Sequence, residues 1–246
     1  MSKIFRQKKK SLVMNGILIL FAIVMWVVLS LTSYEIVNRL SQYEAARLEY
    51  TQLRDELGVL ELVTAQVLEK LEYQESEIYK SIWQIKLYNL KSTNESIVGW
   101  IEVPGTSISY PIVQGDDNSW YLYHTISGQS NPSGAIFLDY RNNSDFTDRH
   151  SLIYGHNMRD GSMFAGLHTW DGALFFIHTK THSLKFDVFN RAILCQYDEL
   201  FVLPDRIIDD KRVVTLSTCV FGNDDLRYVV QGIYIAFSED FFVTNP

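Results

Sequence analysis

The stretch RVVTLSTCVFGNDDLRYVVQGIYIAF, residues 212–237, contains two runs rich in valine, isoleucine and tyrosine around a Gly-Asn-Asp-Asp segment. β-Branched and aromatic residues favour strands, and glycine beside asparagine or aspartate favours the turn between them. If the two runs pair as a hairpin, Cys219 at the end of the first lies close to Arg227 at the start of the second.

The same composition extends over residues 93–246. All five prolines and eleven of the thirteen glycines lie at or beyond Gly99, and short apolar runs alternate with turn signals. Many short strands of this kind predict a β-barrel or β-sandwich of about 150 residues. Short helices are expected only at Ser119–Tyr123 and Ser162–Leu167. The other predicted strands are the runs VGWIEV, ISYPIVQG, GAIFLDY, HSLIYG, LKFDVF and RAILCQY.

Residues 34–92 are predicted to be helical. They contain no proline, and Gly58 is their only glycine. Apolar residues recur every three or four positions in this segment, which predicts an amphipathic helix or a helix pair that could break at Gly58. We interpret this segment as a stalk that packs on the following domain, because the pattern is short for a coiled coil with a partner chain. The apolar positions at helical spacing are Leu53, Leu57, Leu60, Val63, Val67, Leu71, Ile78, Ile82 and Ile85.

Residues 12–33 are predicted to be a transmembrane anchor. The run LVMNGILILFAIVMWVVLSL, residues 12–31, has no charge, and a helix of this length spans about 30 Å. The leader, residues 1–11, carries five lysines and arginines, which predicts a cytoplasmic N-terminus and an extracellular remainder. A cleaved signal peptide is the alternative, but the apolar run is long for a signal and no Ala-x-Ala site follows it. We therefore expect a single-pass protein of the cell membrane, held there by contact with membrane lipid.

Composition and charge exclude several classes of protein. With 47% hydrophobic and 21% charged residues, the chain is neither disordered nor fibrous. All 29 acidic residues lie at or beyond Glu35, where only 17 basic residues oppose them, a balance of −12. A nucleic-acid-binding protein needs a basic face for the phosphates, so nucleic acid is excluded as a partner.

The only two cysteines are Cys195 and Cys219, which excludes a disulfide-rich mini-fold and a four-cysteine zinc site. In an extracellular domain the two could form a disulfide. Cys195 lies within the run RAILCQY and is interpreted as a small buried residue. Cys219 ends an apolar strand, at a rim where a nucleophile would be exposed. From position alone, a nucleophile, a disulfide and a plain core residue all remain open for Cys219.

A thiol with an ordinary pKa near 8.5 is mostly protonated at neutral pH, so a nucleophilic cysteine needs a nearby imidazole or cation. Among six histidines, His156 follows a predicted strand and precedes a polar turn in LIYGHNMRDGSMF, whereas the other five lack such a cue. Arg227 could hold a substrate carbonyl and its developing oxyanion. The alternative for Arg227 is a surface salt bridge with Asp224 or Asp225.

Three motifs, in this order and spacing, resemble those of a sortase of class B. They are YGHNMRDGSMF at 154–164, TLSTC at 215–219 and Arg227 before VVQG. The resemblance extends over Ser96–Phe237, and it includes IVGWIEVPGTSISYPIVQGDDNSWYLYH at 97–124. It implies a mainly β protein, in which a closed eight-stranded barrel with short helices follows a transmembrane helix and a helical stalk.

The resemblance also implies the activity of a cysteine transpeptidase. Cys219 would form a thioacyl intermediate with the C-terminal sorting signal of a secreted protein. His156 would exchange protons with the leaving and incoming amines, and Arg227 would stabilise the oxyanion. The acceptor would be an amine, usually on a peptidoglycan precursor, and neither a cofactor nor a metal is implied.

By motif position, four residues would line the groove for the sorting peptide: Asn118, Leu122, Ser217 and Thr218. One departure concerns this groove. Class B sortases usually carry a long helix-containing insertion before the TLSTC strand, where this chain has only YDELFVLPDRIIDDK, residues 197–211. We expect the catalytic set to be unaffected, whereas the sorting motif, including an NPxT-type signal, stays open.

Two further functions remain as alternatives. A pilus-assembly enzyme would keep the same chemistry and use a pilin lysine as acceptor. A non-enzymatic envelope protein would use the barrel as a binding module. The presence of Cys219, His156 and Arg227 together favours an enzyme.

Overall fold

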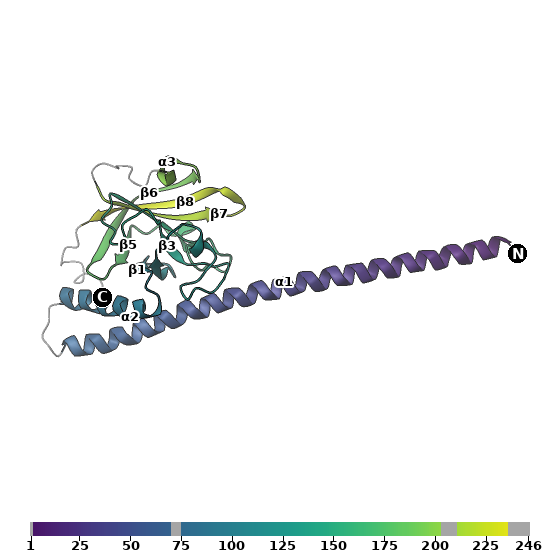
Figure 1. Ribbon diagram of the computed structural model, residues 1–246. Helices are drawn as coiled ribbons and strands as arrows, with labels where there is room; N and C mark the ends of the chain where they lie inside the picture. Colours follow the sequence, from purple (N-terminus) through teal and green to yellow (C-terminus); the bar gives the residue numbers. More distant parts are fainter. Residues whose placement is uncertain (1, 70–74, 203–210, 236–246) are drawn as a thin grey trace. The chain divides into compact units, whose positions relative to one another are not determined.

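The computed structural model describes residues 2–69, 75–202 and 211–235. Two N-terminal helices precede eight strands, with two 3₁₀ helices and one short α-helix in the connections (Figure 1). The chain divides into two compact units, residues 1–45 and residues 46–246, and each is described by itself.

The first unit is the N-terminal part of α1 (Ser2–Glu69), one continuous helix. Within Met14–Gly58 it contains an 18-residue window of mean hydropathy 2.5, none of which is buried. The hydroxyls of Ser30 and Thr32 donate hydrogen bonds to carbonyls one turn earlier in the helix, at 2.8 and 3.0 Å. Because hydrocarbon offers no partner to a hydroxyl, such internal bonds suit an apolar surrounding. The helix is long and apolar enough to cross a membrane.

The second unit begins within α1, and Gly58 lies inside the helix rather than at a break. Tyr50 donates a buried hydrogen bond of 2.7 Å from its hydroxyl to the carbonyl of Gly134. The predicted apolar spacing is confirmed at Leu53 and Leu57, since they share one buried helix face. That face consists of Ala46, Tyr50, Leu53 and Leu57.

A second helix, α2 (Glu75–Thr93), follows, so the predicted helix pair is present. Among the described residues, its buried apolar side chains are those of Trp83, Leu87 and Leu90, and the Trp83 ring stacks on His178 with centroids 3.9 Å apart. Ile85, expected on the apolar face, is 40% exposed, because the buried face of α2 is centred on Trp83 and Leu87 instead. The predicted apolar positions from Leu60 to Ile82 lie in a stretch whose side chains are outside the described part of the structure.

The predicted closed eight-stranded barrel is confirmed. Its strands join in the order β1-β2-β3-β4-β7-β8-β6-β5 and close back on β1. Strand pairs β2·β3 and β4·β7 are parallel, and the other six pairs are antiparallel. The strands are β1 (Ile97–Glu102), β2 (Ser109–Val113), β3 (Ile136–Leu138), β4 (His150–Tyr154), β5 (Leu174–His178), β6 (Ser183–Cys195), β7 (Val213–Val220) and β8 (Asn223–Ile235).

Short helices occupy the connections. The two that the sequence predicts are confirmed as 3₁₀ helices, η1 (Trp120–Leu122) and η2 (Ala165–His168). A third, α3 (Glu199–Val202), lies in the β6–β7 connection and was not predicted. Large aromatic side chains fill the second unit, each less than 2% exposed: Trp100, Phe137, Phe146, Phe164, Phe175 and Phe186.

Gly134 joins three parts of the second unit. Its φ is +55°, and a Cβ at this position would lie 2.4 Å from the carbonyl oxygen of Tyr121 and 2.8 Å from that of Leu122. Only a residue without a Cβ fits such a left-handed turn against backbone. Its own carbonyl accepts the Tyr50 hydroxyl, so α1, η1 and the start of β3 depend on one glycine.

We expect Gly134→Ala to lower the free energy of unfolding by about 2–3 kcal/mol, because a side chain is disfavoured in the left-handed region and would strike backbone. Chemical denaturation followed by tryptophan fluorescence measures this change. The control is Gly166→Ala, where the nearest heavy atom is 3.5 Å away, and its effect should stay below about 1 kcal/mol. Equal effects of the two substitutions would contradict the assigned role of Gly134.

Candidate active site

Cys219 lies near the end of β7, beyond the last residue of β7 that pairs with β4. Pairing with β4 ends at Tyr154 opposite Ser217. The register with β8 shifts directly after Cys219, which pairs with Arg227. The half-buried thiol is therefore at the rim of the barrel, as its position in the sequence predicts.

Arg227 lies directly opposite Cys219 in the β7·β8 hairpin. Opposed residues of an antiparallel pair carry their side chains on the same face, which brings the guanidinium to the thiol side. Its Nη1 donates to the carbonyls of Asp224 and Leu226, at 2.6 and 3.0 Å. Among the described residues, the guanidinium forms no ion pair with Asp224 or Asp225. The salt bridge that the sequence left open is therefore replaced by bonds to backbone.

Gln196 holds the other end of the guanidinium. Its Oε1 accepts from Arg227 Nη2 at 2.9 Å, and its Nε2 donates to Asp225 Oδ1 at 2.9 Å. The Gln196 side chain therefore bridges the carboxylate of Asp225 and the guanidinium of Arg227. The sequence offered no signal for Gln196, because only the long β6·β8 pairing brings it to Arg227.

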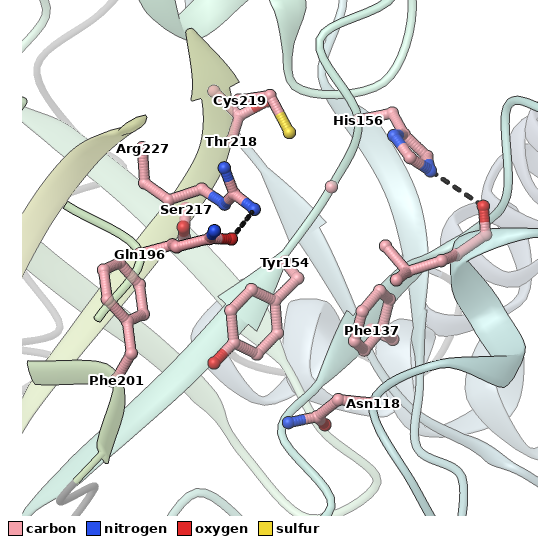
Figure 2. A pocket seen from close by; sticks show the side chains of 12 residues that line it. Asn118, Phe137, Tyr154, His156, Gln196, Phe201, Ser217, Thr218, Cys219 and Arg227 are labelled. Carbon is pink, nitrogen blue, oxygen red and sulfur yellow. Dashed lines mark hydrogen bonds between the residues drawn. The ribbon is translucent and has the colours of Figure 1, made fainter. Parts of the chain in front are cut away.

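His156 follows β4 after Gly155, and its Nε2 lies 2.7 Å from the carbonyl oxygen of Leu122. Because a carbonyl only accepts, Nε2 must carry the proton, and Nδ1 carries the lone pair in the neutral ring. Figure 2 shows Nδ1 on the side of the ring that faces Cys219. The main chain of η1 therefore fixes both the tautomer and the direction of the imidazole.

Burial holds the pKa of His156 below its ordinary value of 6.5. The hydrogen bond to Leu122 opposes this shift, and the positive charge of Arg227 adds to it. The imidazole is therefore neutral at neutral pH. Between its folded pKa and 6.5, the unfolded chain binds more protons at His156 than the folded one does. This residue consequently lowers stability as the pH falls through that window.

The three side chains face one groove of about 220 Å³ (Figure 2). All seven residues proposed from the sequence as catalytic or peptide-binding line it. The groove is therefore built from all three motifs and from segments far apart in the chain. Its lining consists of Asn118, Leu122, Phe137, Tyr154, Gly155, His156, Gln196, Phe201, Ser217, Thr218, Cys219 and Arg227.

Asn118 already has two partners in the protein. Its Nδ2 donates to Asp139 at 2.8 Å, and its Oδ1 accepts from the backbone N–H of Tyr140 at 3.0 Å. An amide can make about four hydrogen bonds, so one donor and one acceptor site remain. The residue is fixed in orientation before any ligand arrives.

Ser217 and Thr218 have buried hydroxyl oxygens without a hydrogen-bond partner, and both residues line the groove. Their exposed fractions are 1% and 2%. A buried hydroxyl left unpaired costs about 1–3 kcal/mol. Neighbouring side chains of a strand point to opposite faces, so only Ser217 shares the face of Cys219 and Arg227, and a polar ligand on that face could pair its hydroxyl.

The short β6–β7 connection still supplies a wall of the groove through Phe201, in α3. Arg141 donates from Nη2 to the carbonyl of Phe201 at 2.8 Å, and it pairs with the fully buried Asp139 at 2.8 Å. Burial alone would raise the pKa of Asp139, but hydrogen bonds from Arg141 and Asn118 outweigh it and keep the pKa low. Through Arg141, the ion pair with Asp139 therefore connects α3 to the barrel. The rest of the connection, 203–210, lies outside the described residues.

The expectation for Cys195 was wrong. It is the last residue of β6 and is exposed rather than buried, since the alternating side chains of this strand end are exposed on one face. Both cysteines are free, so the disulfide alternative is not present in the structure. Cys195 is thus the more exposed of the two cysteines, but only Cys219 lies beside an imidazole and a guanidinium.

Other histidines serve elsewhere in the second unit. His150 is buried, and its Nε2 lies 2.8 Å from Oγ1 of Thr215. The ring of His124 stacks on that of Trp120. In the part of the chain that the structure describes, no three His, Cys, Asp or Glu residues gather as metal ligands would.

Comparison with known proteins identifies the family. A family model described as the sortase domain matches residues 101–234, more than half of the chain and nearly the whole barrel. The chain belongs to the sortase family. Sortase B of Listeria monocytogenes is 41% identical over 124 residues, which are 50% of this chain and 48% of that protein. This sortase thus spans about half the length of that curated relative.

Solved structures agree with the family. Sortase B of Clostridium perfringens is 28% identical with a TM-score of 0.53, and the match covers 61% of this chain and 99% of that one. A class B sortase of Streptococcus pyogenes involved in pilus biogenesis is 31% identical with a TM-score of 0.55, covering 60% and 97%. The relatives of this sortase are therefore of class B.

We expect Arg227→Gln to raise the pKa of His156, because it removes a positive charge that disfavours the imidazolium. Burial remains, so the pKa should stay below 6.5. NMR titration of the imidazole Cε1–H measures the pKa directly. Arg159→Gln is the control, since Arg159 lies three residues from His156 but its guanidinium lies over Phe221. An unchanged pKa in Arg227→Gln would contradict the proposed electrostatic coupling.

Proposed function

We propose that this sortase is a membrane-tethered cysteine transpeptidase. It cleaves a C-terminal sorting signal of secreted proteins and joins them to a cell-wall amine. The observation that carries the proposal is the convergence of Cys219, His156 and Arg227 on one groove. Membership of the sortase family supports the same chemistry.

In the first half-reaction, Sγ of Cys219 attacks the scissile carbonyl carbon while the thiol proton passes to Nδ1 of His156. A C–S bond forms, and the carbonyl oxygen becomes an oxyanion. Collapse restores the carbonyl and breaks the C–N bond, and His156 returns its proton to the leaving amine. The products are a thioester on Cys219 and the released C-terminal fragment.

In the second half-reaction, an acceptor amine attacks the thioester carbonyl. His156 takes a proton from this amine and gives it to the departing sulfur. A new amide forms, and the free thiol is restored. Arg227 cannot supply the proton, because its guanidinium keeps its charge throughout.

Arg227 is suited to hold the oxyanion. Its bonds to Asp224, Leu226 and Gln196 use both hydrogens of Nη1 and one of Nη2. The second Nη2 hydrogen and the Nε hydrogen therefore remain for a substrate oxygen. Because the other bonds fix the guanidinium beforehand, little reorganisation accompanies charge development.

The groove is suited to an extended peptide. Leu122, Phe137 and Phe201 offer apolar surface, and Ser217, on the same strand face as Cys219, offers a hydroxyl. Such a mixture binds apolar side chains and peptide polar groups together. Asn118, with one donor and one acceptor left, would contact the sorting peptide at the far end.

A pilin lysine is the second candidate acceptor, and the S. pyogenes relative involved in pilus biogenesis favours it. A binding module would not need an imidazole and a guanidinium beside a thiol, so the third alternative has less support. Adding a peptide with a free α-amine, or Nα-acetyl-lysine, to acylated protein distinguishes the two acceptors.

We expect incubation of the full chain in detergent with a sorting-peptide library to give a thioacyl adduct at Cys219 by mass spectrometry. Cys219→Ala should form no adduct, and His156→Ala should lose nearly all turnover. Arg227→Lys should lose about 10²- to 10³-fold, because an ammonium lacks the planar fork. Near-native turnover of Arg227→Lys would show that the arginine acts only as a point charge.

We also propose how the chain is organised around this activity. A cytoplasmic leader (1–11) and a transmembrane anchor (12–33) would precede a helical stalk (34–92) and the catalytic barrel (93–246). The apolar, unburied window in α1 supports the anchor. Membrane lipid would then be a partner of residues 12–33.

Protease added to intact protoplasts should remove the barrel and leave a small membrane-bound fragment, because the barrel would lie outside. Immunoblotting with antibodies against each end measures both parts. Recovery of the barrel from the medium with a new N-terminus near Ser33 would instead indicate a cleaved signal peptide.

A further inference from the structure

The hydrogen-bond ladder between β4 and β7 stops two residues before the thiol. Its last bond runs from the N–H of Gly155 to the carbonyl of Ser217, at 3.1 Å. Backbone directions alternate along a strand, so the carbonyl of Cys219 points to the same side as that of Ser217. Because β4 has ended by then, the carbonyl of the candidate nucleophile needs another partner.

Two side chains take the place of the missing strand. Asn157 Nδ2 lies 3.0 Å from the carbonyl oxygen of Cys219, and His168 Nε2 lies 3.1 Å from it. Asn157 Nδ2 is a donor to this carbonyl, and it also lies 3.0 Å from His168 Nε2. According to its tautomer, His168 Nε2 either donates to the same carbonyl oxygen or accepts from the Asn157 amide and orients it. We call Asn157 and His168 the carbonyl clasp.

The loop after His156 fixes the first member of the clasp. The N–H of Phe164 bonds to the carbonyl of His156 at 2.9 Å, and a β-bridge joins Asn157 to Met163. Met163 is buried with a φ of +54°, an unfavourable conformation for a bulky side chain. Such strain persists where surrounding contacts over-determine the backbone, and it is common at functional sites.

His168, the second member of the clasp, is held by a contact with β8. His168 ends η2, and its exposed ring stacks on Tyr228 with centroids 4.6 Å apart. Tyr228 directly follows Arg227 in β8. The clasp therefore binds the carbonyl of Cys219, and it connects the neighbour of His156 with the neighbour of Arg227.

We propose that Asn157 and His168 are positioning residues that hold the main chain of Cys219, so that the thiol stays aligned with His156 and Arg227. This proposal rests on the proposed function of the same site. Neither residue lines the groove. The clasp therefore acts on thiol reactivity and on the acylation step, and it leaves peptide binding unaffected.

Variants at His168 separate the hydrogen bond from the stacking. His168→Phe keeps an aromatic ring for Tyr228 and removes the hydrogen-bonding nitrogen Nε2. His168→Gln removes the ring and retains an amide N–H near the position of Nε2. Asn157→Ala removes the amide donor. The matched control is His182→Phe, on the β5–β6 turn, where the imidazole contacts Thr181 instead of the site.

The first measurement is the rate of iodoacetamide alkylation at Cys219 in the full chain, resolved by peptide mapping, with the exposed Cys195 as internal reference. We expect His168→Phe and Asn157→Ala to slow Cys219 about three- to tenfold, the range of one lost hydrogen bond, and to leave Cys195 unchanged. His168→Gln should remain within about twofold of the native rate, and His182→Phe should match it.

The second measurement is turnover of the library peptide that acylates Cys219. We expect kcat to fall by the same factor as alkylation while KM stays constant, because the clasp lies outside the groove. An unchanged alkylation rate in His168→Phe, or equal losses in His168→Gln and His168→Phe, would overturn the clasp. If the native chain forms no thioacyl adduct but the alkylation pattern holds, the transpeptidase proposal fails and the clasp stands.

Discussion

The register of β7 against β8 is the constraint on which the site depends. It sets Cys219 opposite Arg227 at the last pair before the register shifts. Side chains alternate along a strand, so a slip by one residue would turn the thiol and the guanidinium to the other face. Closure of the barrel pins this register, because β7 also pairs with β4 and β8 also pairs with β6. Strand pairing therefore keeps the thiol of Cys219 and the guanidinium of Arg227 next to each other on one face of the hairpin.

The histidine depends on a different set of contacts. His156 bonds to the main chain of Leu122 in η1, and η1 in turn packs against Gly134, whose carbonyl holds Tyr50 of α1. The orientation of the imidazole is therefore linked by backbone contacts to the helix that precedes the barrel. Residues 46–57 of α1 are therefore part of the structure that supports the site.

Electrostatics and solvation in the groove favour a neutral resting state. Burial and the neighbouring Arg227 disfavour the imidazolium, whereas Ser217 and Thr218 leave buried hydroxyls unpaired. A bound peptide would exclude water, and the charge of Arg227 would then act in a drier site. A neutral imidazole beside the permanent charge of Arg227 suits the proposed reaction, in which a negative charge would develop on the substrate.

The sequence by itself predicted a β-barrel or β-sandwich after a helix or helix pair, because strand alternation, turn signals and helical spacing are local properties. The closed eight-stranded barrel and the joint choice of Cys219, His156 and Arg227 followed from the resemblance of three motifs to those of sortases. The sequence did not reveal Gln196, Asn157 or His168, and it misjudged Cys195 and Ile85. Whether a side chain faces the interior or solvent at a strand end depends on which elements cover it. Only the tertiary structure decided which backbone carbonyls are left without a strand partner and which distant side chains bond to them, since those contacts join residues far apart in the chain.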